Sequence, residues 1–206
     1  MSKNLVIVFE GIETSGKSTS LKKAVKYLKK NKIKYITFRE PGGTKFSEKL
    51  RSLMLNKKSK LNIKTDLFLL MASRSENYDK ILKENYKKKV ILIDRFLDST
   101  LAYQHYGMGL DKNIILRMNN FLLGNLKPNF TFLSVVNKKN MLKRLKSRKN
   151  NNKYDNFNYN FYYKVQKGFL KIALTNKSKY LILDSNKDSL KIIENTLINK
   201  IKEILK

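Results

Sequence analysis

The octapeptide GIETSGKS, at residues 11–18, constrains the fold of this chain most strongly, because it matches the phosphate-loop pattern G-x-x-x-x-G-K-[ST] at every position. The pattern carries weight only between a strand and a helix. Here the apolar run NLVIVFE precedes it at residues 4–10, and a helical pattern follows from Lys17 to about Lys30. The sequence therefore predicts a nucleoside triphosphate site at this strand–helix junction.

The residue types of the loop suit phosphate chemistry. Its glycines let backbone N–H groups turn toward phosphate oxygens, and the helix N-terminus adds partial positive charge. Lys17 is expected to reach the β- and γ-phosphates, and the Ser18 hydroxyl to bind Mg²⁺. We therefore expect ATP and Mg²⁺ as cofactors.

The rest of the chain alternates strands and helices. Further short buried runs predict strands at residues 33–38, 89–94, 128–135 and 179–184. Helical patterns cover residues 45–56, 64–86, 98–105, 111–123, 138–148 and 187–205, and another helix follows the Asn-rich run at 149–156 and reaches about 176. We interpret that run as a mobile loop. Five buried strands with helical crossovers predict an α/β, P-loop NTPase-type three-layer fold, with a five-stranded parallel sheet flanked by helices.

Length and composition exclude several classes. The 206 residues suffice for one domain, which we expect to span residues 1–206. No apolar stretch approaches the roughly 18 residues of a membrane span, and no signal peptide is visible. Without cysteine and with His105 as the single histidine, disulfides, thiolate metal sites and a Ser-His-Asp triad are not expected. We expect a cytoplasmic protein.

The formal net charge of +29 has two interpretations. One is a basic surface that binds nucleic acid. The other, which we favour, is a general compositional bias toward Lys and Asn that affects all surface positions alike. Arginine is more informative, because the chain has 38 Lys but only seven Arg. Six of these lie in or beside motifs, where a planar bidentate donor matters: Arg39, Arg51, Arg74, Arg95, Arg144 and Arg148.

Two further motifs end predicted strands. REPGGT, at 39–44, places Arg39 and Glu40 where ligands bind in parallel α/β folds. The Pro-Gly-Gly sequence by itself indicates only a tight turn, and such a turn requires neither of these two charged residues. LIDRFLDSTLAYQ, at 92–104, ends a strand at Asp94, which is placed to act on Mg²⁺ or its water shell, and Arg95 is placed to hold a second phosphate. The next helix is expected to present four polar side chains to this site: Asp98, Thr100, Tyr103 and Gln104. Tyr103 taken alone would also suit packing in the core.

Together these segments resemble the thymidylate kinase (dTMP kinase) family, of the bacterial type. FEGIETSGKST, REPGGT, LMASR and DRFLDSTLAYQ occur in the family's order and spacing, from about residue 4 to the final helix. DRxxDSxxAYQ together with REPGG is specific, since other nucleoside monophosphate kinases share only the phosphate loop and the general fold. The resemblance implies a nucleoside monophosphate kinase-like fold and phosphorylation of dTMP to dTDP by ATP.

The resemblance also assigns roles around dTMP. Glu13 matches the acidic residue that faces the sugar, and Tyr103 the aromatic residue beside the 2′ position. Arg51, Arg74 and Arg95 match arginines that hold the phosphate and base edge. The full dTMP set that it implies is Glu13, Arg39, Glu40, Pro41, Arg51, Leu70, Arg74, Arg95, Thr100, Tyr103 and Gln104.

On the ATP side the resemblance implies a lid at about residues 144–160. Because the loop between Gly11 and Gly16 lacks arginine, the family pattern moves a catalytic cation to this lid. The implied catalytic residues are Lys17, Arg95, Arg148 and Lys153, and the implied metal residues are Ser18 and Asp94. The implied ATP set is Gly11, Ile12, Glu13, Thr14, Ser15, Gly16, Lys17, Ser18, Thr19 and Arg144.

The chain departs from the family pattern at three positions. Leu70 replaces the usual phenylalanine against thymine, which removes aromatic stacking of on the order of 1–3 kcal/mol. Lys153 stands where arginine is frequent, and Phe157 stands where an acidic residue is usual, although Asp155 remains nearby.

Other functions stay open at this point. Leu70 makes a kinase for another pyrimidine monophosphate plausible, and the charge allows a basic P-loop protein that binds nucleic acid. An inactive homologue is a third alternative, which the intact Lys17, Ser18, Asp94 and Arg95 oppose. The resemblance suggests a homodimer through helices near 64–86 and 111–123. The composition predicts no membrane partner, and a nucleic-acid partner is the less favoured alternative.

Overall fold

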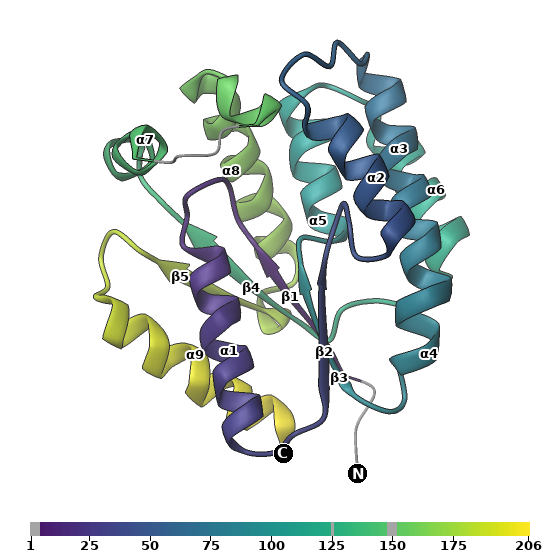
Figure 1. Ribbon diagram of the computed structural model, residues 1–206. Coiled ribbons are helices and arrows are strands. Elements are labelled where there is room, and N and C mark those ends of the chain that lie inside the picture. Colours follow the sequence, from purple (N-terminus) through teal and green to yellow (C-terminus); the bar gives the residue numbers. More distant parts are fainter. Residues whose placement is uncertain (1–4, 125, 148–151) are drawn as a thin grey trace.

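Five parallel strands form one sheet in the order β2-β3-β1-β4-β5, which confirms the predicted α/β fold (Figure 1). The computed structural model of the chain describes residues 5–124, 126–147 and 152–206. The strands are β1 (Val6–Glu10), β2 (Tyr35–Arg39), β3 (Val90–Asp94), β4 (Phe130–Val135) and β5 (Tyr180–Asp184).

Helices cover both faces of the sheet and make three layers. Along β1, Ile7 and Phe9 face a core with α1 (Lys17–Lys30) and α9 (Leu190–Leu205), which lie side by side. The alternate residues Val6 and Val8 face a second core on the opposite side. Successive strand side chains point to opposite faces, so a strand buried on both sides must be apolar throughout.

The other α-helices begin close to the predicted positions. In the described part of the chain they are α2 (Lys45–Leu55), α3 (Ile63–Asn77), α4 (Lys83–Asn85), α5 (Leu97–Thr100), α6 (Lys112–Leu123), α7 (Lys138–Lys146) and α8 (Tyr159–Thr175). Side-chain caps from Asn62, Asp111 and Asn158 accept backbone N–H groups and so start α3, α6 and α8. Across the described residues, no helix combines the length and the apolar character that a membrane crossing needs.

Local structure differs from the prediction in three places. The helix predicted over 64–86 contains a π-helical segment, Tyr78–Leu82, and α5 continues as a second one, Leu101–Gly107. Such widened turns are frequent at functional sites. Part of the run predicted as a loop is a 3₁₀ turn, Lys153–Asn156, because Asn152 and Asp155 form a reciprocal capping box.

Parallel register brings the three motifs to one edge of the sheet. Arg39 at the end of β2 pairs with Asp94 at the end of β3, and Asp94 in turn pairs with Phe9 of β1. The phosphate loop, the REPGGT segment and the DRFLDS segment therefore leave the sheet side by side, where ligands bind in this architecture.

Candidate active site

The phosphate loop connects β1 to α1, as predicted. Its backbone takes left-handed conformations at Thr14, with φ 61°, and at Gly16, with φ 98°. At Gly11 a side chain would also collide, since a Cβ would lie 2.4 Å from the carbonyl oxygen of Ser134 on β4. The loop is thus held against the sheet and lies directly before the N-terminus of α1. Helix N-termini of this kind bind anions.

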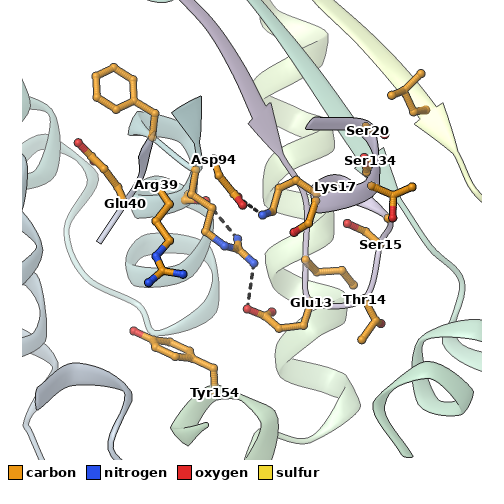
Figure 2. Close-up of a pocket in the computed structure, with 18 of the residues that line it drawn as sticks. Glu13, Thr14, Ser15, Lys17, Ser20, Arg39, Glu40, Asp94, Ser134 and Tyr154 are labelled. Atoms are coloured by element: carbon orange, nitrogen blue, oxygen red, sulfur yellow. Dashed lines mark hydrogen bonds and ion pairs between the residues drawn. The ribbon is translucent and has the colours of Figure 1, made fainter. Parts of the chain in front are cut away.

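Lys17, in the first turn of α1, forms an ion pair with Asp94 at the end of β3 (Figure 2). Burial lowers the pKa of Lys17, the nearby Arg95 lowers it further, and Asp94 opposes both. Figure 2 places this pair between the phosphate loop on one side and Arg39 with Glu40 on the other. The ammonium therefore lies between the two ends of the site.

Arg95, Glu13 and Tyr103 form a second connected group. Arg95 Nη2 donates to Glu13 Oε1 at 2.9 Å, and the Tyr103 hydroxyl donates to the other oxygen of that carboxylate. The Arg95 guanidinium also lies 5.0 Å from the centre of the Tyr103 ring. Burial raises the pKa of Tyr103 well above its usual value, so the phenol stays a neutral donor.

Arg74 and Glu40 form a buried ion pair beside this group. Arg74 Nε donates to Glu40 Oε2 at 2.8 Å, and burial raises the pKa of Glu40 while Arg74 opposes the rise. Further Arg74 donors reach Asn119, the Phe96 carbonyl and Thr100. Protein groups thus engage at least four of the five guanidinium N–H donors, and Arg74 acts largely as a fixed wall of the site.

Two more arginines line the mouth of the site. Arg51 Nη1 donates to the Pro41 carbonyl at 2.8 Å, and Arg39 Nη2 donates to Glu48 Oε2 at 2.8 Å. Burial lowers the pKa of Arg51 to about 10, with repulsion from Arg39 as the next cause. A bound dianion would relieve that repulsion.

Arg144, at the end of α7, ties the phosphate loop to the segment after β5. Its Nη1 donates to the Thr14 carbonyl at 2.9 Å and to Ser185 Oγ at 3.1 Å. The predicted ATP residue therefore contacts the loop backbone directly.

Glu10, at the end of β1, is a buried carboxyl that sequence reasoning did not single out. It accepts from the backbone N–H groups of Phe96 and Ser99 and from the Ser99 hydroxyl. Burial and the nearby charge of Asp98 raise the pKa of Glu10 to about 7. These bonds hold the start of α5 against β1 and so position Arg95.

One cleft of about 1100 Å³ joins all these groups. Nearly every predicted site residue lines it, including Ser18, Thr19, Leu70 and Gln104. Gly11 and Lys153 are not on the cleft wall that the described residues form, and Arg148 lies outside the described residues. Lys153 Nζ instead donates to Asp66 Oδ1 at 2.8 Å.

Asp66, on α3, is a second buried carboxylate that sequence reasoning did not single out. It also accepts from the Tyr154 hydroxyl at 2.8 Å and from Gln104 Nε2 at 3.3 Å. A sequence signal existed, since Asp66, Leu70 and Arg74 are spaced four residues apart and share one helix face.

A phosphate loop that shares one cleft with several arginines is the arrangement of an ATP-dependent nucleoside monophosphate kinase. The family model for thymidylate kinase matches residues 9–196. The chain belongs to the thymidylate kinase family.

Individual relatives agree over almost the full length. The thymidylate kinase of Kosmotoga olearia is 36% identical over 191 residues, covering 92% of each chain. That of a Sulfurihydrogenibium species is 37% identical over 188 residues, covering 90% of this chain and 91% of the relative. The crystal structure of thymidylate kinase from Ehrlichia chaffeensis superimposes with a TM-score of 0.79 at 30% identity, covering 98% of this chain and 100% of that one.

Proposed function

We propose that the chain transfers the γ-phosphoryl group of ATP to dTMP and so forms dTDP and ADP. The observation that carries this proposal is the single cleft that joins the phosphate loop to the arginine cluster, here meaning Arg39, Arg51, Arg74 and Arg95. Family membership supports thymidylate as the acceptor.

In the proposed reaction an oxygen of the dTMP phosphate attacks the γ-phosphorus, and the bond to the ADP oxygen breaks. The acceptor is already a phosphate oxygen, so no general base of unusual pKa is needed. Alignment and charge neutralisation supply the catalysis. Lys17 acts on the donor phosphates, and Arg95 holds the acceptor in line.

The remaining side chains suit a deoxynucleotide. Tyr103 and Glu13 line the cleft and are hydrogen-bonded to each other, and a hydroxyl on the 2′ carbon of the substrate would meet the aromatic ring. Thr100 and Gln104 supply polar contacts to the base, and Leu70 gives it an apolar wall. These roles extend to this chain the set that the family pattern implies.

The residues present fit a magnesium ion. Asp94 and Ser18 line the cleft and offer a carboxylate and a hydroxyl oxygen, the hard ligands that Mg²⁺ takes alongside substrate phosphates. Among the described residues no group of three or more His, Cys, Asp or Glu gathers to form an all-protein cage. When bound, the ion would neutralise phosphate charge, and Asp94 would exchange its pairing with Lys17 for the metal or its water.

We further propose one domain over residues 1–206, with a lid at about 144–160. The single five-stranded sheet supports one domain. Arg144 at one end of the lid contacts the phosphate loop, and Tyr154 further along lines the cleft. Closure of this segment would limit attack by water on ATP.

A panel of acceptors tests the function. We expect ADP release with dTMP to exceed that with UMP, CMP and dGMP by at least roughly a hundredfold in kcat/KM, because those bases or sugars leave polar groups unpaired. dUMP lacks only a methyl group, so a deficit of roughly tenfold is expected. A coupled ADP-release assay measures all five, and salt-sensitive DNA binding without any turnover would favour the nucleic-acid alternative instead.

We also propose a homodimer through α3 and α6. Phe121 and Phe68 are 87% and 62% exposed, and they border a shallow apolar groove with Met71, Met118 and Leu122. Exposed apolar surface of this kind marks an interaction site.

The absence of cysteine and the nucleotide substrates support a cytoplasmic location.

Phe121→Glu is expected to convert the dimer to a monomer, because the new carboxylate would be buried unpaired at the interface. Sedimentation velocity at micromolar concentration measures the change. Leu174→Glu on α8 is the matched control, since Leu174 is 58% exposed on a different helix. A parent protein that sediments as a monomer would contradict the dimer.

A further inference from the structure

The Asp66 carboxylate is a buried charge that the proposed reaction does not use. It lies in the first turn of α3 and is 1% exposed. Both of its oxygens are occupied: Oδ1 accepts from Lys153, and Oδ2 accepts from Tyr154 and Gln104. A carboxylate in such a place is costly unless it is paired and hydrogen-bonded.

Two of its three donors belong to one short stretch of the lid. We call residues 152–157 the lid segment; it contains the 3₁₀ turn Lys153–Asn156. Lys153 and Tyr154 are 87 and 88 residues from Asp66 in the chain, so only folding brings them together. If the lid segment moved away, Asp66 would keep only the longer contact from Gln104 at 3.3 Å. The buried charge therefore favours the docked lid segment.

The docked lid segment contributes directly to the cleft. Asn152 and Tyr154 line it, and the Tyr154 ring packs edge-on against Tyr103 with centroids 5.7 Å apart. Figure 2 shows Tyr154 below Arg39 and Glu13 among the residues that line the cleft. Burial, followed by the charge of Asp66, raises the pKa of Tyr154 well above its usual value, which keeps its hydroxyl a donor.

We propose that Asp66 is a positioning residue that latches the lid segment over the acceptor end of the cleft through Lys153 and Tyr154. In this role Lys153 keeps the lid segment, including Tyr154, in place along the cleft. Its ammonium is then not the cation that neutralises the transferring phosphoryl group. The kinetic consequence rests on the proposed function, whereas the latch itself is testable without substrate.

The substrate-free test uses the absence of tryptophan from this chain. Phe157→Trp introduces one reporter into the lid segment, at a ring that stacks on Phe161 with centroids 4.1 Å apart. In this background Asp66→Asn, Lys153→Met and Tyr154→Phe should each raise the acrylamide quenching constant roughly twofold, as expected of a local opening. Asp79→Asn, at an exposed carboxylate, is the matched control and should leave it unchanged.

Tyr154→Phe and Lys153→Met leave α3 itself intact, so they keep the test valid if Asp66→Asn fails to fold. Equal quenching in the parent, Lys153→Met and Tyr154→Phe would overturn the latch. This arm remains decisive even if the chain phosphorylates no nucleotide.

The kinetic test is a double-mutant cycle with dTMP as acceptor. Asp66→Asn and Lys153→Met should each raise the KM for dTMP roughly tenfold with a smaller change in kcat, as for loss of one charged hydrogen bond. The double variant should be no worse than either single variant, because both break the same contact. A fall in kcat confined to Lys153→Met, adding to the effect of Asp66→Asn, would overturn the proposal and make Lys153 a catalytic cation.

Discussion

Lys17→Met is expected to lower kcat for ADP formation roughly 10³-fold, with little change in the KM for dTMP. Lys17 lies in the first turn of α1 beside the phosphate loop, and its ammonium forms an ion pair with Asp94. Charge spreads over the transferring group in the transition state, so the lost cation weakens that state more than it weakens acceptor binding. Steady-state kinetics with saturating ATP measure the effect.

Lys26→Met is the matched control, since Lys26 is exposed on the same helix. It should leave kcat within about twofold of the parent, as usual for a surface substitution. Because Lys17 is buried and pairs with Asp94, thermal unfolding of both variants separates lost folding from lost chemistry. A folded Lys17→Met protein that retains a tenth of the parent kcat would remove Lys17 from the catalytic set.

Arg95→Met is expected to lower kcat/KM for dTMP roughly 10³-fold. The variant loses the expected grip on the acceptor phosphate and leaves Glu13, whose side chain is 12% exposed, without its ion-pair partner. Arg95→Lys should recover part of the loss and remain roughly 10²-fold below the parent, because an ammonium offers no planar pair of donors. The expected order of kcat/KM is therefore parent, lysine, methionine.

Arg117→Met serves as the control, because Arg117 is exposed on α6 away from the cleft. Isothermal titration with dTMP complements the kinetics, since a residue that holds the acceptor must alter its binding. Unchanged dTMP affinity in Arg95→Met would show that the arginine supports Glu13 and Tyr103 without contacting the acceptor.

Much of the architecture is visible in the sequence because its causes are local. A strand buried on both faces must be apolar throughout, as in VIVFE of β1, and α1 begins at Lys17 directly after the loop glycine. The type of helix is harder to predict where the backbone geometry depends on tertiary packing. The π-helical segments at 78–82 and 101–107 look like ordinary helix in sequence, since nothing local distinguishes them.

The candidate site was predictable to the extent that motifs end strands. Arg39 and Asp94 are the last residues of strands that pair in parallel, so their proximity follows from the topology. Asp66 was missed because a carboxylate in a first helical turn is usually an exposed partner of the helix dipole. Here it is buried and faces a lid segment that lies more than eighty residues away in the chain.

The phosphate loop, the parallel α/β architecture and the arginines expected at a second phosphate could all be predicted from the sequence. These follow from short-range patterns that only one kind of local structure satisfies. The tertiary structure alone decided which charges pair: Lys17 with Asp94, Arg95 with Glu13, and Lys153 with Asp66. Ion pairing depends on distance and burial in space, and neither is encoded at any one place along the chain.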